Sequence, residues 1–140
     1  MGTPYDVIYK WALRKIEDPS LVQWPDDVLD EELHGWMLSA ISKFRKCKND
    51  LSDRDDELRC FNSELLLIEQ EILAVLMARE WLAPQLNSVN LTRQVFGGKE
   101  EKFYSQAAHG DFLNERDEKL KLEAQQLHRD YTYIDNDFFD

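Results

Sequence analysis

The sequence predicts an all-α fold, a bundle of about four to five helices that ends in one long helix. Apolar residues recur at helical spacing through most of the 140 residues, and the alternating runs that indicate strands are almost absent. Residues 108–134 combine many charges with one thin apolar line, as in a helix that packs along a single neighbour. We expect a single helical domain over 1–134 and a short acidic, aromatic tail over 135–140.

The first part of the chain is expected to form two helices, over 4–17 and 26–47. Thr3 and Pro4 supply an N-cap and a first-position proline for the first of them. The second segment has acidic residues at its start and basic residues at its end, which is the order that the helix dipole favours. Residues 19–25 are expected to form a linker between the two helices.

A third helix is expected to begin after Ser63 and to end before Pro84. It is apolar on more than one face, which indicates that it is the central element of the core. A shorter helix over 85–95 should follow it. Between the second and third helices, the polar residues 49–57 are expected to form a loop, and residues 58–61 a short extended piece.

The apolar line of the last helix follows a seven-residue repeat. Its members, called the seam below, are Leu113, Asp117, Leu120, Ala124, Leu127, Tyr131 and Ile134. A long helix that buries so little needs a neighbouring helix. We therefore predict a subunit interface formed by Leu113, Leu120, Ala124, Leu127, Tyr131 and Ile134. Replacing Leu120 and Leu127 by Asp is expected to weaken assembly more than it unfolds the chain.

Charge and composition argue against several classes of function. A net charge of -11 makes the chain a poor ligand for nucleic acid, because phosphate binding relies on Lys and Arg. No apolar run approaches the roughly 18 residues that are needed to cross a bilayer, and no signal peptide opens the chain. Cys47 and Cys60 show no pairing pattern. These features predict a cytosolic setting with free thiols.

No pattern in the sequence predicts catalysis, a cofactor or a bound metal. The three histidines are far apart and match no metal-binding spacing. The acidic segment over 50–57 is not a calcium loop, because Arg54 and Asp55 stand where such a loop needs an oxygen ligand and a glycine. We expect a protein that is not an enzyme.

Two aromatic features suggest contacts with a partner protein. Trp24 lies in the expected linker, and tryptophan is favoured at the centres of protein interfaces. Burial as a core or lid residue is the more common alternative for it. Phe138 and Phe139 lie among aspartates in the tail, where the sequence is consistent with a frayed end or with a peptide that docks on a partner.

Four segments resemble small virion proteins of tailed bacteriophages and prophages of Gram-positive bacteria. They are Thr3-Pro4-Tyr5-Asp6, Phe44-Arg45-Lys46-Cys47-Lys48-Asn49-Asp50-Leu51, Trp81-Leu82-Ala83-Pro84-Gln85 and Arg129-Asp130-Tyr131-Thr132-Tyr133. In size and helix order the chain is similar to the head–tail connector adaptors, and the likeness covers most of its length. It rests on the combination of segments, because none of them has a chemical signature.

The resemblance implies a function in assembly. Adaptors of this family form a homo-oligomeric ring, usually a dodecamer, beneath the portal, and DNA passes through the ring without specific binding. The implied partners are the portal protein and the next neck or tail protein. The implied location is the virion neck, after synthesis in the bacterial cytoplasm. Two alternatives remain open, another tail or neck completion component and an acidic helical regulator that binds a basic partner.

Overall fold

The computed structural model describes the backbone of residues 2–96 and 101–137, and the side chains of residues 2–88 and 110–133. Within these residues helices dominate, which confirms the predicted all-α class. The α-helices described are Tyr5–Ile16 (α1), Asp26–Lys43 (α2), Leu67–Phe96 (α3) and Glu101–Asp137 (α4). A 3-10 helix, Pro19–Gln23 (η1), occupies most of the predicted linker.

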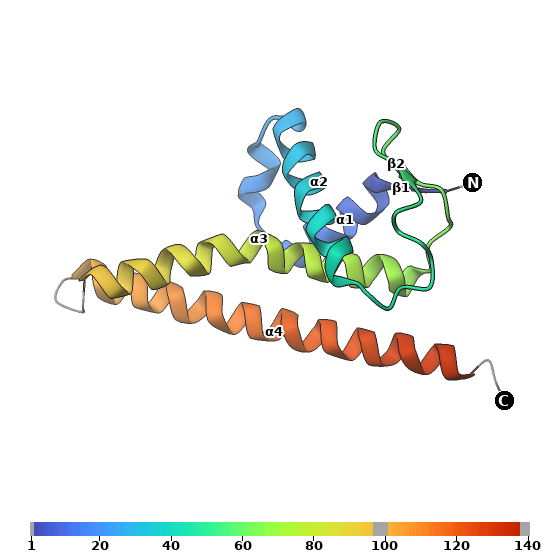
Figure 1. The fold of residues 1–140 in the computed structure, drawn as a ribbon. Coiled ribbons are helices and arrows are strands. Elements are labelled where there is room, and N and C mark those ends of the chain that lie inside the picture. The colour runs from blue at the N-terminus through green and yellow to red at the C-terminus, as the bar shows by residue number, and fades with distance from the viewer. Residues whose placement is uncertain (1, 97–100, 138–140) are drawn as a thin grey trace.

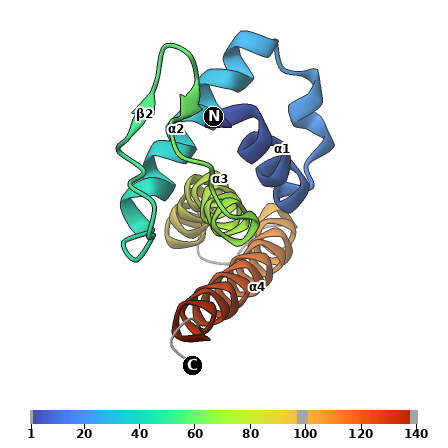
Figure 2. The same ribbon diagram turned by 90° about the vertical axis from the view of Figure 1, so that its right-hand side faces the viewer.

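The long helix α3 lies at the centre of the arrangement (Figure 1). α1 and α2 pack on one face of α3, and α4 runs antiparallel along another, so that all three contact it. Figure 2 shows the same layers nearly end-on, with α1 and α2 above the pair formed by α3 and α4. Beyond the part that α1 and α2 cover, α3 and α4 continue together as a two-helix hairpin (Figure 1).

The core forms where other helices cover α3 on more than one side. Residues 72–78 of α3 are all buried, so every face of this segment is enclosed. The buried residues of α1 are Tyr5, Ile8, Tyr9, Ala12 and Ile16, and those of α2 are Leu33, Met37 and Ala40. The prediction that the third helix is the central element of the core is confirmed.

One helix replaces the two that the sequence predicts on either side of Pro84. This proline lies inside α3, which continues to Phe96. A proline lacks the backbone N–H and leaves the carbonyl of the residue four positions earlier, here Glu80, without its helical partner. Pro84 itself is exposed, so its ring does not have to fit into the core. Leu82 and Leu86, before and after the proline, both pack on the core and keep the helix continuous.

A small antiparallel sheet lies at the N-terminal end of α1. Its strands are β1 (Thr3–Pro4), β2 (Arg54–Asp55) and β3 (Cys60–Phe61), in the order β1-β3-β2. β3 lies in the segment that is predicted to be extended, whereas Thr3 is predicted only as a helix cap. Its hydroxyl instead donates to the carbonyl of Ser63 and accepts the amide of Leu65. Strands of two residues are too short for an alternating pattern to show in the sequence.

The ends of three helices differ from the prediction. α3 begins at Leu67 and not directly after Ser63. α2 ends at Lys43 rather than at residue 47, because the chain turns at Phe44 while the Phe44 amide still bonds the carbonyl of Ala40. α4 extends beyond the expected 108–134 at both ends. Residues 135–137 of the predicted tail are therefore helical, and residues 138–140 lie outside the described residues.

Candidate functional site

Among the side chains that the structure describes, no group of three His, Cys, Asp or Glu residues could hold a metal ion. His34 lies beside Asp56, and His128 bonds the carbonyl of Ala124 in its own helix. The side chain of His109 lies outside the described residues. None of the described helices has a stretch that is both long and apolar enough to span a membrane. The notable features of the described residues are instead the loop over 50–57, which hydrogen bonds hold against α1 and α2, and the surfaces that the rest of the chain leaves exposed.

The seam of α4 is covered by the same chain. Its buried members are Leu113, Leu120, Ala124 and Tyr131. Leu127 packs partly buried against the same core, Asp117 pairs with Arg79 of α3 at 3.2 Å, and the side chain of Ile134 lies outside the described residues. The partner helix is α3.

This arrangement corrects the predicted subunit interface. A heptad seam shows that a helix has a neighbouring helix, but it does not show which chain supplies the neighbour. Here α3 and α4 are consecutive and antiparallel, so the contact is made within one chain. Leu120 is 7% exposed, and its replacement by Asp is now expected to disturb the fold of the single chain first.

A buried carboxylate fastens the C-terminal half of α4 to the start of α3. Glu69 of α3 is fully buried and accepts a hydrogen bond of 2.7 Å from the hydroxyl of Tyr131 in α4. Its other donors are the side-chain amide of Asn49 at 2.7 Å, the thiol of Cys47 at 3.3 Å and the backbone amide of Leu66 at 2.7 Å. α4, α3 and the loop after α2 thus meet at one carboxylate.

The network around Glu69 sets the ionisation of its members. Burial by itself would raise the pKa of Glu69, but the hydrogen bonds, led by the one from Tyr131, bring that pKa below its ordinary value. Burial, reinforced by the neighbouring carboxylate, raises the pKa of Cys47 to about 12. The thiol is therefore protonated and unreactive at neutral pH. With four donors bound, the carboxylate of Glu69 holds these segments together inside the fold.

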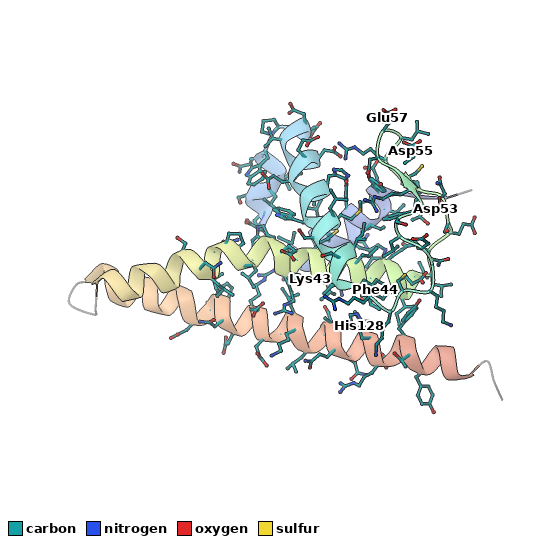
Figure 3. All side chains as sticks on the ribbon, viewed as in Figure 1. Lys43, Phe44, Asp53, Asp55, Glu57 and His128 are labelled. Atoms are coloured by element: carbon teal, nitrogen blue, oxygen red, sulfur yellow. The ribbon has the colours of Figure 1, made fainter. Side chains whose placement is uncertain are left out.

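The acidic loop over 50–57 uses its own carboxylates to hold its turns. Asp50 accepts the amide of Ser52, and Asp55 accepts the amides of Glu57 and Leu58, as in Asx turns. Figure 3 shows the side chains of Asp53, Asp55 and Glu57 at the outer side of this loop. Most of the charge that the sequence concentrates here therefore shapes the loop and faces solvent.

One carboxylate of the loop ties it to the helices. Asp56 accepts a hydrogen bond of 2.6 Å from the hydroxyl of Tyr5 in α1 and lies 3.2 Å from the ring nitrogen of His34 in α2. The Tyr5 bond is the main cause that lowers the pKa of Asp56. Arg54 also contacts this carboxylate, at 3.3 Å. The loop therefore has a fixed position on α1 and α2.

A groove of about 890 Å³ lies between the C-terminal part of α1 and α4. Its most exposed apolar side chains, Phe112 and Leu122, are each 55% exposed. Its charged side chains are equal in number, Arg14, Lys15, Arg116 and Lys119 against Glu17, Glu115, Glu118 and Glu123. The charges of its described lining residues therefore balance and do not favour a partner of either sign. Sequence reasoning missed it because Phe112 and Leu122 lie off the seam.

Trp24 belongs to an exposed surface at the start of α2. This surface, called the acidic corner below, consists of Val22, Trp24, Asp26, Asp27 and Val28. Val22 is 83% exposed, Val28 46% and Trp24 36%, so Trp24 is not a core residue. Its predicted role in partner docking stays a prediction. The corresponding prediction for Phe138 and Phe139 lies outside the described residues.

A second surface lies at the opposite end of α2. There the Phe44 ring contacts the ring of His128 in α4 edge-on, with centroids 5.4 Å apart (Figure 3). Beside this contact is an open hollow of about 600 Å³, called the basic hollow below, which is lined by Lys46, His128, Arg129, Thr132 and Tyr133. No carboxylate among the described side chains lines it, and Tyr133 is 70% exposed. The sequence gives no signal for it, because Lys46 and α4 meet only in the folded chain.

In comparisons with known proteins, the chain matches no protein-family model, no curated protein and no solved structure. The described residues leave the α1–α4 groove, the acidic corner and the basic hollow uncovered on a frame of packed helices.

Proposed function

We propose that this protein is a structural assembly component, a head–tail connector adaptor of a tailed bacteriophage. The extended shape of the chain carries the proposal. Its accessible surface is 9184 Å², whereas compact monomers of its mass, 16.6 kDa, average about 7,600 Å². The excess is comparable to the area that two proteins bury in a standard interface. This excess of exposed surface supports a protein that acts as a subunit and buries part of its surface against neighbouring subunits.

The helical hairpin accounts for this surface. α3 has 30 residues and α4 has 37, which correspond to lengths of about 45 Å and about 55 Å. α1 and α2 cover only one part of the pair (Figure 1). A long two-helix arm on a small body offers contact area to neighbours, whereas an enzyme needs a cleft with convergent polar groups.

The charge of the chain suits a ring through which DNA moves. At -11 for each chain, a ring of several copies repels the phosphate backbone instead of binding it. The resemblance to connector adaptors adds the rest of the proposal. The chain would form a ring, usually a dodecamer in that family, between the portal and the next neck or tail protein in the virion.

The experiment is to mix the purified chain with the portal protein of the same phage. Light scattering gives the mass of the mixture, and electron microscopy gives the symmetry of any complex. We expect a ring on the portal that matches the portal's symmetry. A chain that stays monomeric and leaves the portal unbound would overturn the adaptor function. Binding to a basic protein in competition with DNA would then favour the acidic regulator.

A further inference from the structure

Charge is separated along the chain around α2. The segment over 17–42 contains seven carboxylates and no Lys or Arg, and they are Glu17, Asp18, Asp26, Asp27, Asp30, Glu31 and Glu32. The next six residues contain four cations and no carboxylate, and these cations are Lys43, Arg45, Lys46 and Lys48. α2 has 18 residues, so about 27 Å separates its two ends. The acidic corner and the basic hollow lie at these opposite ends.

Both surfaces also expose apolar side chains. Val22, Trp24 and Val28 are exposed at the acidic corner. At the basic hollow, the exposed ring of Tyr133 stands beside the partly buried ring of His128. A helix dipole explains why acids gather at one end of α2 and cations at the other. It does not explain why each end leaves aromatic or aliphatic surface in water, which is typical of protein contacts.

Four charges inside these surfaces lack ionic partners among the described residues, whereas several charges next to the surfaces have such partners. Within the described residues, no ion pair forms at Asp26 or Asp27, or at Lys46 or Arg129. By contrast, Asp30 and Glu31 both pair with Arg59, and Lys43 pairs with Glu80. Asp26 and Asp27 on one surface, and Lys46 and Arg129 on the other, are therefore available for ionic contacts with another molecule.

We propose that the acidic corner of one copy of this chain docks into the basic hollow of the next copy. The two surfaces have opposite charge, so a two-fold contact that joined like surfaces would bring like charges together. A head-to-tail contact pairs the carboxylates of one copy with the cations of the other and covers the apolar side chains of both. Repetition of such a contact closes a ring or extends a filament. The inference rests on the proposed assembly function and names the subunit contact.

The test is a charge exchange between two variants. The first carries Asp26→Lys and Asp27→Lys, and the second carries Lys46→Glu and Arg129→Glu. In either variant alone, the two surfaces have the same sign, so we expect each to lose the higher-mass species of the wild type. In an equimolar mixture, each reversed corner faces a reversed hollow and each native corner faces a native hollow. We therefore expect the mixture to recover the wild-type mass, measured by light scattering.

Matched controls change the same charge at other exposed positions. Glu57→Lys with Glu64→Lys matches the first variant, and Lys10→Glu with Lys121→Glu matches the second. Circular dichroism and thermal unfolding show whether every variant is folded. We expect both controls to assemble as the wild type does.

Several outcomes would overturn the inference. They are wild-type assembly by either charge variant alone, a mixture that fails to recover the assembly, and a wild-type chain that stays monomeric at millimolar concentration with and without the portal. Portal binding by the folded variants is read separately. Portal binding without the charge exchange effect would remove this contact and leave the proposed function standing. Recovery of assembly by the mixed variants without portal binding would support this contact and overturn the proposed adaptor function.

Discussion

The two long helices of this protein differ in how they are supported. α3 is buried on every face over residues 72–78, because α1, α2 and α4 all pack against it. Among its described side chains, α4 buries a narrow line of apolar residues against α3, at Leu113, Leu120, Ala124 and Tyr131, and most of the others are exposed or half-buried. The difference explains why α3 is rich in apolar residues and α4 in charged ones.

The comparison assigns different roles to the two helices. Changes in α3 should act on the whole fold, since every neighbouring helix depends on it. Changes in the seam of α4 should act on one helix–helix contact, and changes on the outer faces of α4 should leave stability almost unaltered. The predictions below test this order of effects.

The largest effect is expected in the centre of α3. Leu73 is fully buried, and Leu73→Ala removes buried methyl groups and leaves a cavity. We expect the free energy of unfolding to fall by about 2–5 kcal/mol, measured by urea denaturation followed by circular dichroism. A loss that is no larger than that of a matched substitution in the α4 seam would contradict the central role of α3.

The next effect is expected at Glu69, where the two long helices are fastened together. All four of its partners donate hydrogen bonds, and a glutamine would turn an NH₂ group toward some of these donors. Glu69→Gln should therefore cost about 1–3 kcal/mol. Tyr131→Phe should cost less, because the carboxylate keeps its three other donors. Equal stability of Glu69→Gln and the wild type would show that the network contributes nothing.

The same carboxylate predicts a pH dependence. The pKa of Glu69 is lower in the folded chain than its ordinary value, so its stabilisation is complete above the ordinary glutamate pKa of about 4.3. It is lost as the pH falls through the folded-state pKa, since the unfolded chain binds the proton first. The stability difference between the wild type and Glu69→Gln should therefore shrink in acid. A difference that is constant from neutral pH to acid would contradict this assignment.

Local patterns predicted most of the helices, because helical periodicity depends on neighbours in the chain. They identified α3 as the core helix and found the seam of α4. They failed where the result depends on contacts between distant residues. Packing on the core carries α3 through Pro84, and the chain's own α3, rather than a second subunit, covers the seam. Local patterns also did not indicate the basic hollow, because Lys46 and Arg129 come together only after the chain folds.

Two leucines in α4 allow the contribution of the buried seam to stability to be compared with that of the exposed surface. Leu120 is 7% exposed and Leu122 is 55% exposed, although they are two residues apart in the same helix. Leu120→Ala should lower the free energy of unfolding by about 2 kcal/mol, and Leu122→Ala should change it by less than about 0.5 kcal/mol. Both are measured by urea denaturation of the single chain. Equal effects would mean that α4 does not bind α3 through the seam.

A small gain in stability is expected at Gly35, on the outer side of α2. A Cβ added there meets no other atom within 4 Å, so Gly35→Ala gains the helix propensity of alanine without a clash. It should raise the free energy of unfolding by about 1 kcal/mol, measured by thermal unfolding. Gly2→Ala is the contrasting substitution, because its Cβ would meet the backbone carbonyl of Phe61 in β3 and force β1 away. Replacement of glycine by alanine should therefore stabilise the protein at Gly35 in α2 and destabilise it at Gly2, next to the small sheet. A destabilised Gly35→Ala variant would indicate that this face of α2 is covered in solution, and then the outer side of α2 would join the acidic corner as part of an interface.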